Sequence, residues 1–244
     1  MQMYLYIPKN GFLLSLCLTV VGMNYASAGV VLNTTRVIYS ADKDEATVKI
    51  TNNNAGPVLI QSWLDRGDEN ASPSRIAVPF VLTPPINRLN QGRGQTLRIT
   101  YLGSPALPLD KETVFWLNVL EVPAKQATSA DKNRIKVAFR TRIKLFYRPL
   151  GLPGNANQAP SQLQWQTTPD GVRVSNPTPY YVNMGTVTYR SNGKNYETAG
   201  EMIAPGGTRN VHFKEIQSVT HLNQLSFTAI NDYGAFANFN AGGK

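Results

Sequence analysis

The chain has 244 residues, of which 42% are hydrophobic and 16% are charged, and its formal net charge is +9 at pH 7. This length allows one large or two medium-sized domains, and the composition excludes an intrinsically disordered chain. The positive charge favours an acidic partner, such as an anionic surface or a nucleic acid.

Residues 1–28 have the pattern of a secretory signal peptide. Lys9 supplies a positive charge, residues 12–21 form an apolar core, and residues 26–28 (Ala-Ser-Ala) form a small-residue cleavage site. The apolar core is too short to cross a membrane, and no later run reaches the roughly 20 apolar residues that a membrane helix needs. We therefore predict export without membrane insertion, with a mature chain that begins at Gly29. Export argues against nucleic acid as the partner.

The single cysteine, Cys17, lies inside this predicted signal. The mature chain then has neither disulfides nor thiolate chemistry, so its stability must come from hydrophobic cores.

From Val30 onward the apolar runs are short, rich in β-branched residues and separated by turn residues, which is typical of an all-β protein. The predicted strands of the first half are Val30 to Tyr39, Thr47 to Asn52, Val58 to Leu64, Ile76 to Leu82, Thr96 to Tyr101 and Val114 to Val122. A longer strand follows from Arg134. Seven strands in about 120 residues is the count of an immunoglobulin-like sandwich.

The stretch Asn133 to Pro149 is the most regular of the chain. Its odd positions are apolar or β-branched, and its even positions carry most of its lysines and arginines. This period of two predicts a long β-strand with one apolar and one cationic face. Such a strand can extend beyond its own sheet and offer its backbone to a partner.

A proline- and glycine-rich stretch, residues 149–154, separates the two halves, and we interpret it as a short, stiff linker. Strand patterns resume after it and predict a second, smaller β-sandwich. The expected organisation is a signal peptide at 1–28, a first domain at 29–148, the linker at 149–154 and a second domain at 155–244. The predicted strands of the second half are Gln162 to Gln166, Val172 to Asn176, Met184 to Tyr189, Arg209 to Phe213 and Leu225 to Asn231.

The sequence gives little support for a catalytic site or a metal site. The two histidines, His212 and His221, lack the spacing of a metal motif or a nucleophile partner. The acidic cluster of Asp65, Asp68 and Glu69 lacks the alternating oxygen ligands of a calcium loop, and we interpret it as a solvated turn. We predict no catalytic residue, no metal and no cofactor.

Several motifs in order along the chain resemble the PapD-like periplasmic chaperones of chaperone–usher pilus assembly. They are Thr35 to Tyr39, Gln61 to Trp63, Pro79-Phe80 with Thr83-Pro84-Pro85, Leu107 to Pro123, Arg142 to Pro149, Asn176 to Tyr181 and Ile230 to Gly234. The resemblance implies two immunoglobulin-like β-sandwich domains in a boomerang arrangement, with a cleft between them.

The resemblance also implies three sets of site residues. Arg36 and Lys144 match the two bases that hold the C-terminal carboxylate of a pilin. A second set, which fills the open groove of the pilin, is matched by Ile135, Val137 and Phe139. The third set, an inter-domain salt bridge, is matched by Glu112, Arg148 and Asp232.

Without the resemblance, Arg36 and Lys144 would be ordinary solvated bases, and the three apolar residues would belong to the core of their own domain. Strict alternation places Lys144 on the face opposite to Ile135, Val137 and Phe139. The family assignment therefore leads us to expect a bulge or a strong twist between Phe139 and Lys144.

The implied function is that of an ATP-independent periplasmic chaperone, which binds pilin subunits by donor-strand complementation and delivers them to an outer-membrane usher. The short connection from Ala124 to Asn133, without flanking cysteines, resembles the short-loop branch of the family. Arg134 and Lys136 add charge where relatives often carry uncharged residues. Two other classes stay open from the residues alone, namely a basic β-sandwich adhesin for acidic glycans and, with less support, a hydrolytic enzyme.

Overall fold

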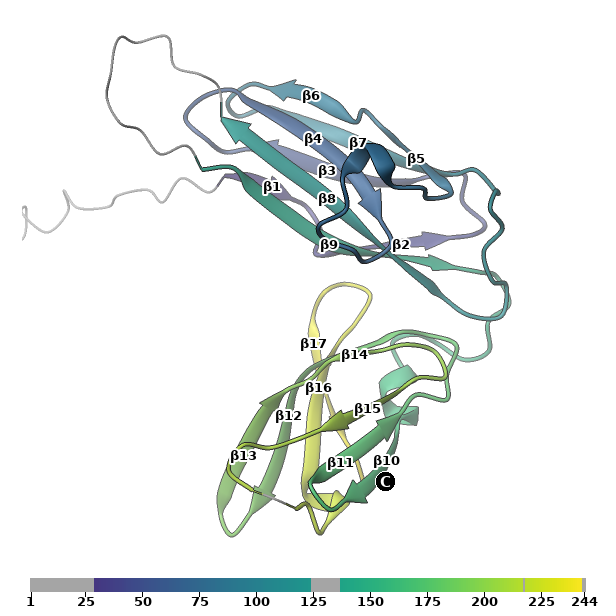
Figure 1. The fold of residues 1–244 in the computed structure, drawn as a ribbon, viewed down its shortest axis with the longest axis vertical. Helices are drawn as coiled ribbons and strands as arrows, with labels where there is room; N and C mark the ends of the chain where they lie inside the picture. The colour runs from purple at the N-terminus through teal and green to yellow at the C-terminus, as the bar shows by residue number, and fades with distance from the viewer. Residues whose placement is uncertain (1–28, 124–136, 217, 243–244) are drawn as a thin grey trace, which may run out of the picture.

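The structure is a computed structural model that describes residues 29–123, 137–216 and 218–242. Over these ranges strands predominate, and none of the described helices is long and apolar enough to cross a membrane. The strands form two β-sandwiches that lie at an angle to each other and are joined at one end (Figure 1). The predicted all-β class with two domains is confirmed. The predicted signal peptide and Ile135 lie outside the described residues.

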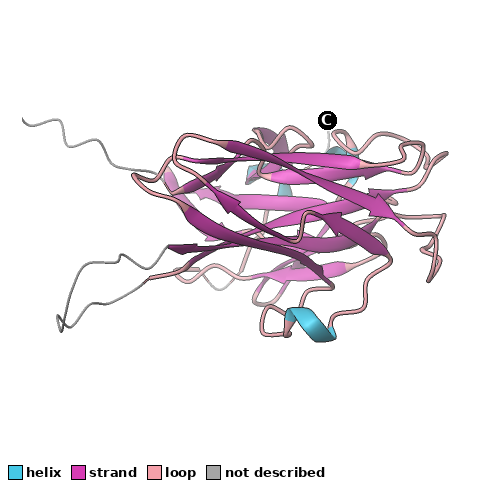
Figure 2. Ribbon diagram, turned by 90° about the horizontal axis from the view of Figure 1, so that it is seen from above, coloured by secondary structure: helices cyan, strands magenta, loops and turns pink. Residues whose placement is uncertain are grey.

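The first sandwich packs a four-stranded sheet against a five-stranded sheet. The first sheet has the order β1 (Val30–Leu32), β3 (Ala46–Asn52), β7 (Gly94–Tyr101) and β5 (Phe80–Thr83). The order in the second is β2 (Arg36–Ser40), β9 (Phe139–Arg148), β8 (Thr113–Pro123), β4 (Val58–Asp65) and β6 (Ile86–Leu89). Seen from above, the strands form stacked layers, and the short 3-10 helix Pro73–Arg75 lies outside them (Figure 2).

Alternate residues of both sheets fill the space between them. Ile50 and Leu97 from one sheet and Phe115 and Leu145 from the other are almost fully buried in a single cluster. Each such side chain contributes about 1.5–3 kcal/mol by leaving water. The predicted source of stability, a hydrophobic core, is thus present in this domain.

The strand predicted from Val30 to Tyr39 is wrong in one respect, because the chain breaks it into β1 and β2. Residues 33–35 are not in a strand, and the hydroxyl of Thr34 donates to the carbonyl of Arg36. The chain thereby leaves β3, its antiparallel partner in the first sheet, and joins β9 in the second sheet as a parallel neighbour. This change of sheet brings Arg36 into register with Lys144.

The expected bulge between Phe139 and Lys144 is absent. Strand β9 pairs with β8 without interruption from Phe139 opposite Glu121 to Tyr147 opposite Thr113. The two faces therefore stay separate along the whole described strand. Ile143, Leu145 and Tyr147 continue the apolar face into the core, whereas Lys144 lies on the outer face.

The second sandwich is smaller and has its own core. One sheet has the order β10 (Gln164–Thr168), β11 (Gly171–Ser175) and β15 (Thr208–Val211). In the other the order is β13 (Lys194–Ala199), β12 (Val182–Ser191), β16 (Leu225–Ile230) and β17 (Phe236–Asn240), with β14 (Met202–Ile203) beside the start of β12. The 3-10 helices Ala159–Gln162 and Leu222–Gln224 flank the sheets.

Four strands, β6, β13, β14 and β17, were not predicted. They are two to six residues long, and β6 begins directly after the Thr83-Pro84-Pro85 turn. Strands this short carry too few alternating positions to stand out from their turns. The predicted strand from Ile76 is likewise shorter in the structure, since β5 begins only at Phe80.

Candidate functional site

Arg36 and Lys144 lie side by side on the outer face of the five-stranded sheet, where the first domain meets the second. Their Cα positions are paired in the parallel ladder of β2 and β9. The side chain of Arg36 is buried, and its Nη1 donates to the carbonyl of Ile230 in the second domain at 3.0 Å. Its Nε is also buried, but has no hydrogen-bond partner among the described residues.

The electrostatics of this pair indicate a shortage of negative charge. Burial lowers the pKa of Lys144, and the nearby charge of Arg36 lowers it further. Burial also lowers the pKa of Arg36, although Asp232 acts in the opposite direction. Within the described part of the chain, no carboxylate forms an ion pair with either base. Two adjacent cations that are largely removed from water and not ion-paired favour the binding of an anion.

The edge of β9 is open over its first half. Strand β2 covers β9 only from Lys144 to Arg148, whereas β8 on the other side pairs from Phe139 onward. From Phe139 to Ile143, the backbone groups that point away from β8 therefore have no strand partner among the described residues. An open edge of this kind can accept a strand from another chain.

The described members of the predicted groove-filling set are exposed rather than buried in their own domain. Val137 has 52% and Phe139 has 62% of its surface exposed. The alternative that these two residues are core residues is therefore wrong. Phe139 lies at the first residue of β9, and its face of the strand continues into the buried Ile143 and Leu145.

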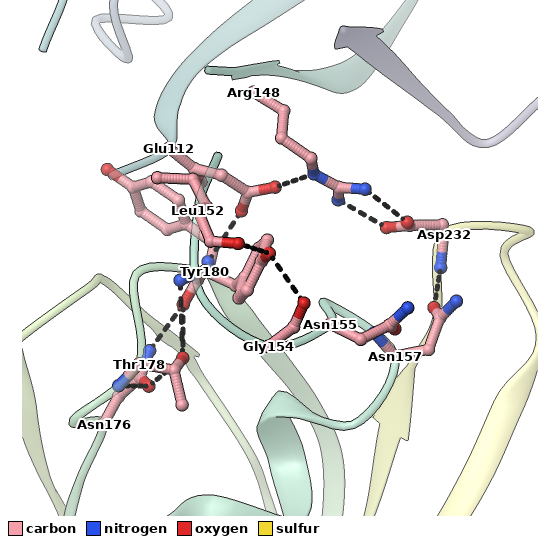
Figure 3. A network of polar contacts seen from close by, with 11 residues as sticks. Glu112, Arg148, Leu152, Gly154, Asn155, Asn157, Asn176, Thr178, Tyr180 and Asp232 are labelled. Atoms are coloured by element: carbon pink, nitrogen blue, oxygen red, sulfur yellow. Dashed lines mark hydrogen bonds and ion pairs between the residues drawn. The ribbon is translucent and has the colours of Figure 1, made fainter. Parts of the chain in front are cut away.

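Glu112, Arg148 and Asp232 are in direct contact across the domain boundary (Figure 3). The Nε of Arg148 donates to Glu112 Oε1 at 2.6 Å, and its two terminal nitrogens donate to the carboxylate of Asp232 at 2.7 and 2.9 Å. The other oxygen of Glu112 accepts a bond from the backbone of Tyr181 in the second domain at 2.8 Å. The arginine therefore joins a carboxylate from each domain.

Burial and the charges within the network act on the pKa values of its members in opposite directions. Burial raises the pKa of Glu112, which is nearly inaccessible, although Arg148 acts in the opposite direction. Burial would lower the pKa of Arg148, but the hydrogen bonds and charges of Asp232 and Glu112 outweigh it and raise the pKa. The charged form of Arg148 is thus strongly favoured, and its loss would leave Glu112 uncompensated.

The prediction of a solvated acidic turn is wrong for Asp65, which is buried, whereas Asp68 and Glu69 are exposed. The side chain of Asp65 is only 2% exposed and accepts bonds from Arg142 at 2.7 Å and from Asn118 at 2.6 Å. Arg142 in turn lies over the ring of Trp116, with its Cζ 4.1 Å from the ring centroid. The Nζ of Lys144 is 5.1 Å from the same centroid.

Sequence reasoning assigned no role to Trp116, although the tryptophan lies within the longest motif of the resemblance. The alternation of β8 indicates that Trp116 and Asn118 share a face. It does not indicate that Lys144 lies directly opposite Trp116, which follows only from the pairing of β8 with β9.

Comparisons with known proteins agree with this architecture. Residues 29–153 match the family described as "Pili and flagellar-assembly chaperone, PapD N-terminal domain", and residues 158–241 match "Pili assembly chaperone PapD, C-terminal domain". The probable fimbrial chaperone YadV of Escherichia coli is 43% identical over 220 residues, which cover 88% of this chain and 89% of YadV. Its crystal structure covers 88% of this chain and 99% of its own with a TM-score of 0.75.

Two further solved structures are similar. The periplasmic chaperone SfaE is 32% identical, with a TM-score of 0.65 over 87% of this chain and 98% of its own. The Salmonella enterica SafB chaperone, solved in complex with the SafA pilin, is similar at 29% identity, with a TM-score of 0.72 over 87% and 96% of the two chains. By its two matched domains and its fimbrial chaperone relatives, the chain belongs to the PapD-like family of pilus-assembly chaperones of the chaperone–usher pathway.

Proposed function

We propose that this protein is an ATP-independent periplasmic chaperone that binds a pilin subunit, completes its fold by donating β9 and delivers it to an outer-membrane usher. One observation carries the proposal. The open edge of β9, from Phe139 to Ile143, ends at the buried Arg36 and the half-buried Lys144, neither of which forms an ion pair within the described residues.

The open edge and the two bases fit adjoining parts of one ligand, a strand and its C-terminal carboxylate. A pilin strand that pairs with the open edge gains backbone hydrogen bonds, and its C-terminal carboxylate reaches Arg36 and Lys144 at the end of that edge. A charge-assisted hydrogen bond to such a carboxylate contributes about 1.5–3 kcal/mol. The missing partner of the buried Arg36 Nε is a further reason to place an acceptor there.

The apolar face of β9 supplies the rest of the affinity. Phe139 and Val137 are exposed in the free protein, and Ile135, which lies outside the described residues, continues the same period of two. Burial of three such side chains in an apolar groove contributes on the order of 5–9 kcal/mol, before the cost of ordering the partners. Because β9 has no bulge, these side chains and Lys144 lie on opposite faces of the same strand.

Relatives support the class of partner and the compartment. SafB was solved bound to a pilin, and SfaE is described as periplasmic. The signal-peptide pattern of residues 1–28 agrees with export to the same compartment.

Replacing Phe139 with glutamate tests the donor strand. The variant would place a charge inside the apolar groove of the pilin, and we expect the yield of complex to fall at least about tenfold. The measurement is co-expression with a pilin encoded beside the chaperone gene, followed by affinity purification of the chaperone and quantification of the bound pilin.

Val81→Glu is the matched control, because Val81 is 46% exposed on β5, an edge strand of the other sheet. This variant should keep the wild-type yield. Equal yields from Phe139→Glu and wild type would show that β9 does not enter the pilin in this register. A complex that dissociates steeply with salt would instead favour a surface held by charge, as in a glycan-binding adhesin.

A further inference from the structure

The ring of Trp116 lies beside the anchor lysine, with the Nζ of Lys144 5.1 Å from its centroid. We infer that Trp116 is a positioning residue, which holds the ammonium group of Lys144 in place for the carboxylate of the ligand. The inference rests on the proposed function, because it concerns the same anchor.

Four neighbouring strands place the participating residues in one row. Arg36 on β2 is in register with Lys144 on β9, Lys144 is opposite Trp116 on β8, and Trp116 is opposite Asp65 on β4. Residues paired directly across strands have side chains on the same face within contact distance. The Nζ of Lys144, 5.1 Å from the ring centroid of Trp116, is within the range of a cation–π interaction.

Trp116 can hold the ammonium without neutralising it. A lysine side chain has four flexible carbons, and its charged end loses much rotamer freedom when a ligand fixes it. An aromatic face attracts the cation but carries no net charge, so Lys144 stays available for a carboxylate. Burial and Arg36 both disfavour the charged form of this lysine, and the ring opposes that tendency.

The ring itself is held in place by Arg142, which lies on the same face of β9 as Lys144. Arg142 lies over it at 4.1 Å from the centroid, and the guanidinium is fixed to the carboxylate of Asp65. Asp65 is fixed in turn by bonds from Asn118 and from the backbone of Gly67. Because Asp65 is ion-paired with Arg142, the bases of this row that form no ion pair within the described residues are Lys144 and Arg36, where the ligand would bind.

The test compares two probes that differ only in the group that the anchor recognises. They are synthetic peptides with the C-terminal sequence of a pilin encoded beside the chaperone gene, one with a free carboxylate and one with a C-terminal amide. The measured quantity is the ratio of their dissociation constants, amide over carboxylate, for the full chaperone. In the wild type this ratio should be at least about ten, the value of one charge-assisted hydrogen bond.

Trp116→Leu keeps apolar bulk but removes the aromatic face. We expect the ratio of the two dissociation constants to be at least about threefold lower in this variant than in the wild type. In Trp116→Phe the ratio should lie close to the wild-type value, since phenylalanine retains a weaker π face. If Trp116→Leu does not fold, the same measurement is made with Trp116→Met. Trp63→Leu is the control, because Trp63 lies on the same face of β4, opposite Asn118, and within the described residues no cation lies over its ring.

The outcomes separate this inference from the proposed function. If Trp116→Leu weakens both peptides equally, Trp116 has only a structural role and the inference is wrong, although the anchor itself stands. If the leucine variant keeps the wild-type ratio, the inference is likewise overturned. If the wild type binds neither peptide, or binds both equally, the proposed carboxylate anchor fails and the positioning role fails with it.

Discussion

Lys144→Ala should abolish the recovery of a chaperone–pilin complex while leaving the free protein folded. The lysine lies at the end of the open edge of β9, and together with Arg36 it is proposed to hold the C-terminal carboxylate of the pilin. Its loss should not destabilise the free protein, because burial and Arg36 both disfavour its charged form there. Co-expression with a pilin and affinity purification measures the complex, and thermal unfolding of the purified variant measures the fold.

Lys49→Ala is the matched control, because Lys49 is an exposed lysine on β3 of the other sheet. It should bind pilin like the wild type. Arg36→Ala should also abolish the complex, with some loss of stability, since Arg36 additionally bonds to the carbonyl of Ile230 in the second domain. Normal co-purification of pilin with folded Lys144→Ala would remove Lys144 from the anchor.

Arg148→Met should lower the thermal stability by more than any surface ion pair would. The arginine compensates Glu112, which is 2% exposed, and its removal leaves a buried carboxylate without a partner. Breaking such a pair costs about 3–5 kcal/mol, which corresponds to a decrease in Tm of roughly 6–20 °C for a protein of this size. Differential scanning calorimetry at neutral pH measures the decrease.

The pH dependence of this effect follows from Glu112. Its folded-state pKa is raised, and loss of the arginine raises it further, so the unfolded protein carries the charge more readily than the folded one. For a group with a raised folded-state pKa, stability is lost as pH rises through that pKa. The decrease in Tm caused by Arg148→Met should therefore be largest at neutral pH and shrink as the pH is lowered towards the ordinary range of glutamate.

Two further variants identify the cause of the loss. Glu112→Gln combined with Arg148→Met should recover part of the stability, because no buried charge is then left behind. Arg209→Met breaks the exposed pair of Arg209 with Glu201 and should cost at most about 1 kcal/mol. If Arg148→Met and Arg209→Met had equally small effects, the inter-domain network would contribute no more than an ordinary surface pair.

Local patterns in the sequence were sufficient for the fold class and for most strands. Alternation with a period of two, interrupted by glycine, proline and asparagine, is a property of neighbouring residues, so it predicted two β-sandwiches without further information. The strand from Val30 to Tyr39 was predicted as continuous because alternation does not show which sheet a strand joins. The break at residues 33–35 moves β2 to the second sheet, and this determines the neighbour of Lys144.

Prediction of the site needed both the motifs in the sequence and the pairing of strands in the structure. Family motifs indicate the residues of the anchor and of the inter-domain network. Their contacts join residues far apart in sequence: Arg36 pairs with Lys144, 108 positions away, and bonds to Ile230, 194 positions away. The expected bulge rested on the assumption that the apolar side chains and the anchor must share a face. The uninterrupted pairing of β9 shows that they do not.

Asp65 shows most clearly what only the tertiary structure could decide. Its neighbours in sequence form a polar turn, which indicates a solvated carboxylate. In the folded protein Arg142, 77 residues away, reaches it across β8 and over the ring of Trp116. The fold class, most of the strands and the family could be predicted from the sequence, because they depend on local order. The burial of Asp65 and the row from it to Arg36 depend on which strands lie side by side, and long-range pairing decides that.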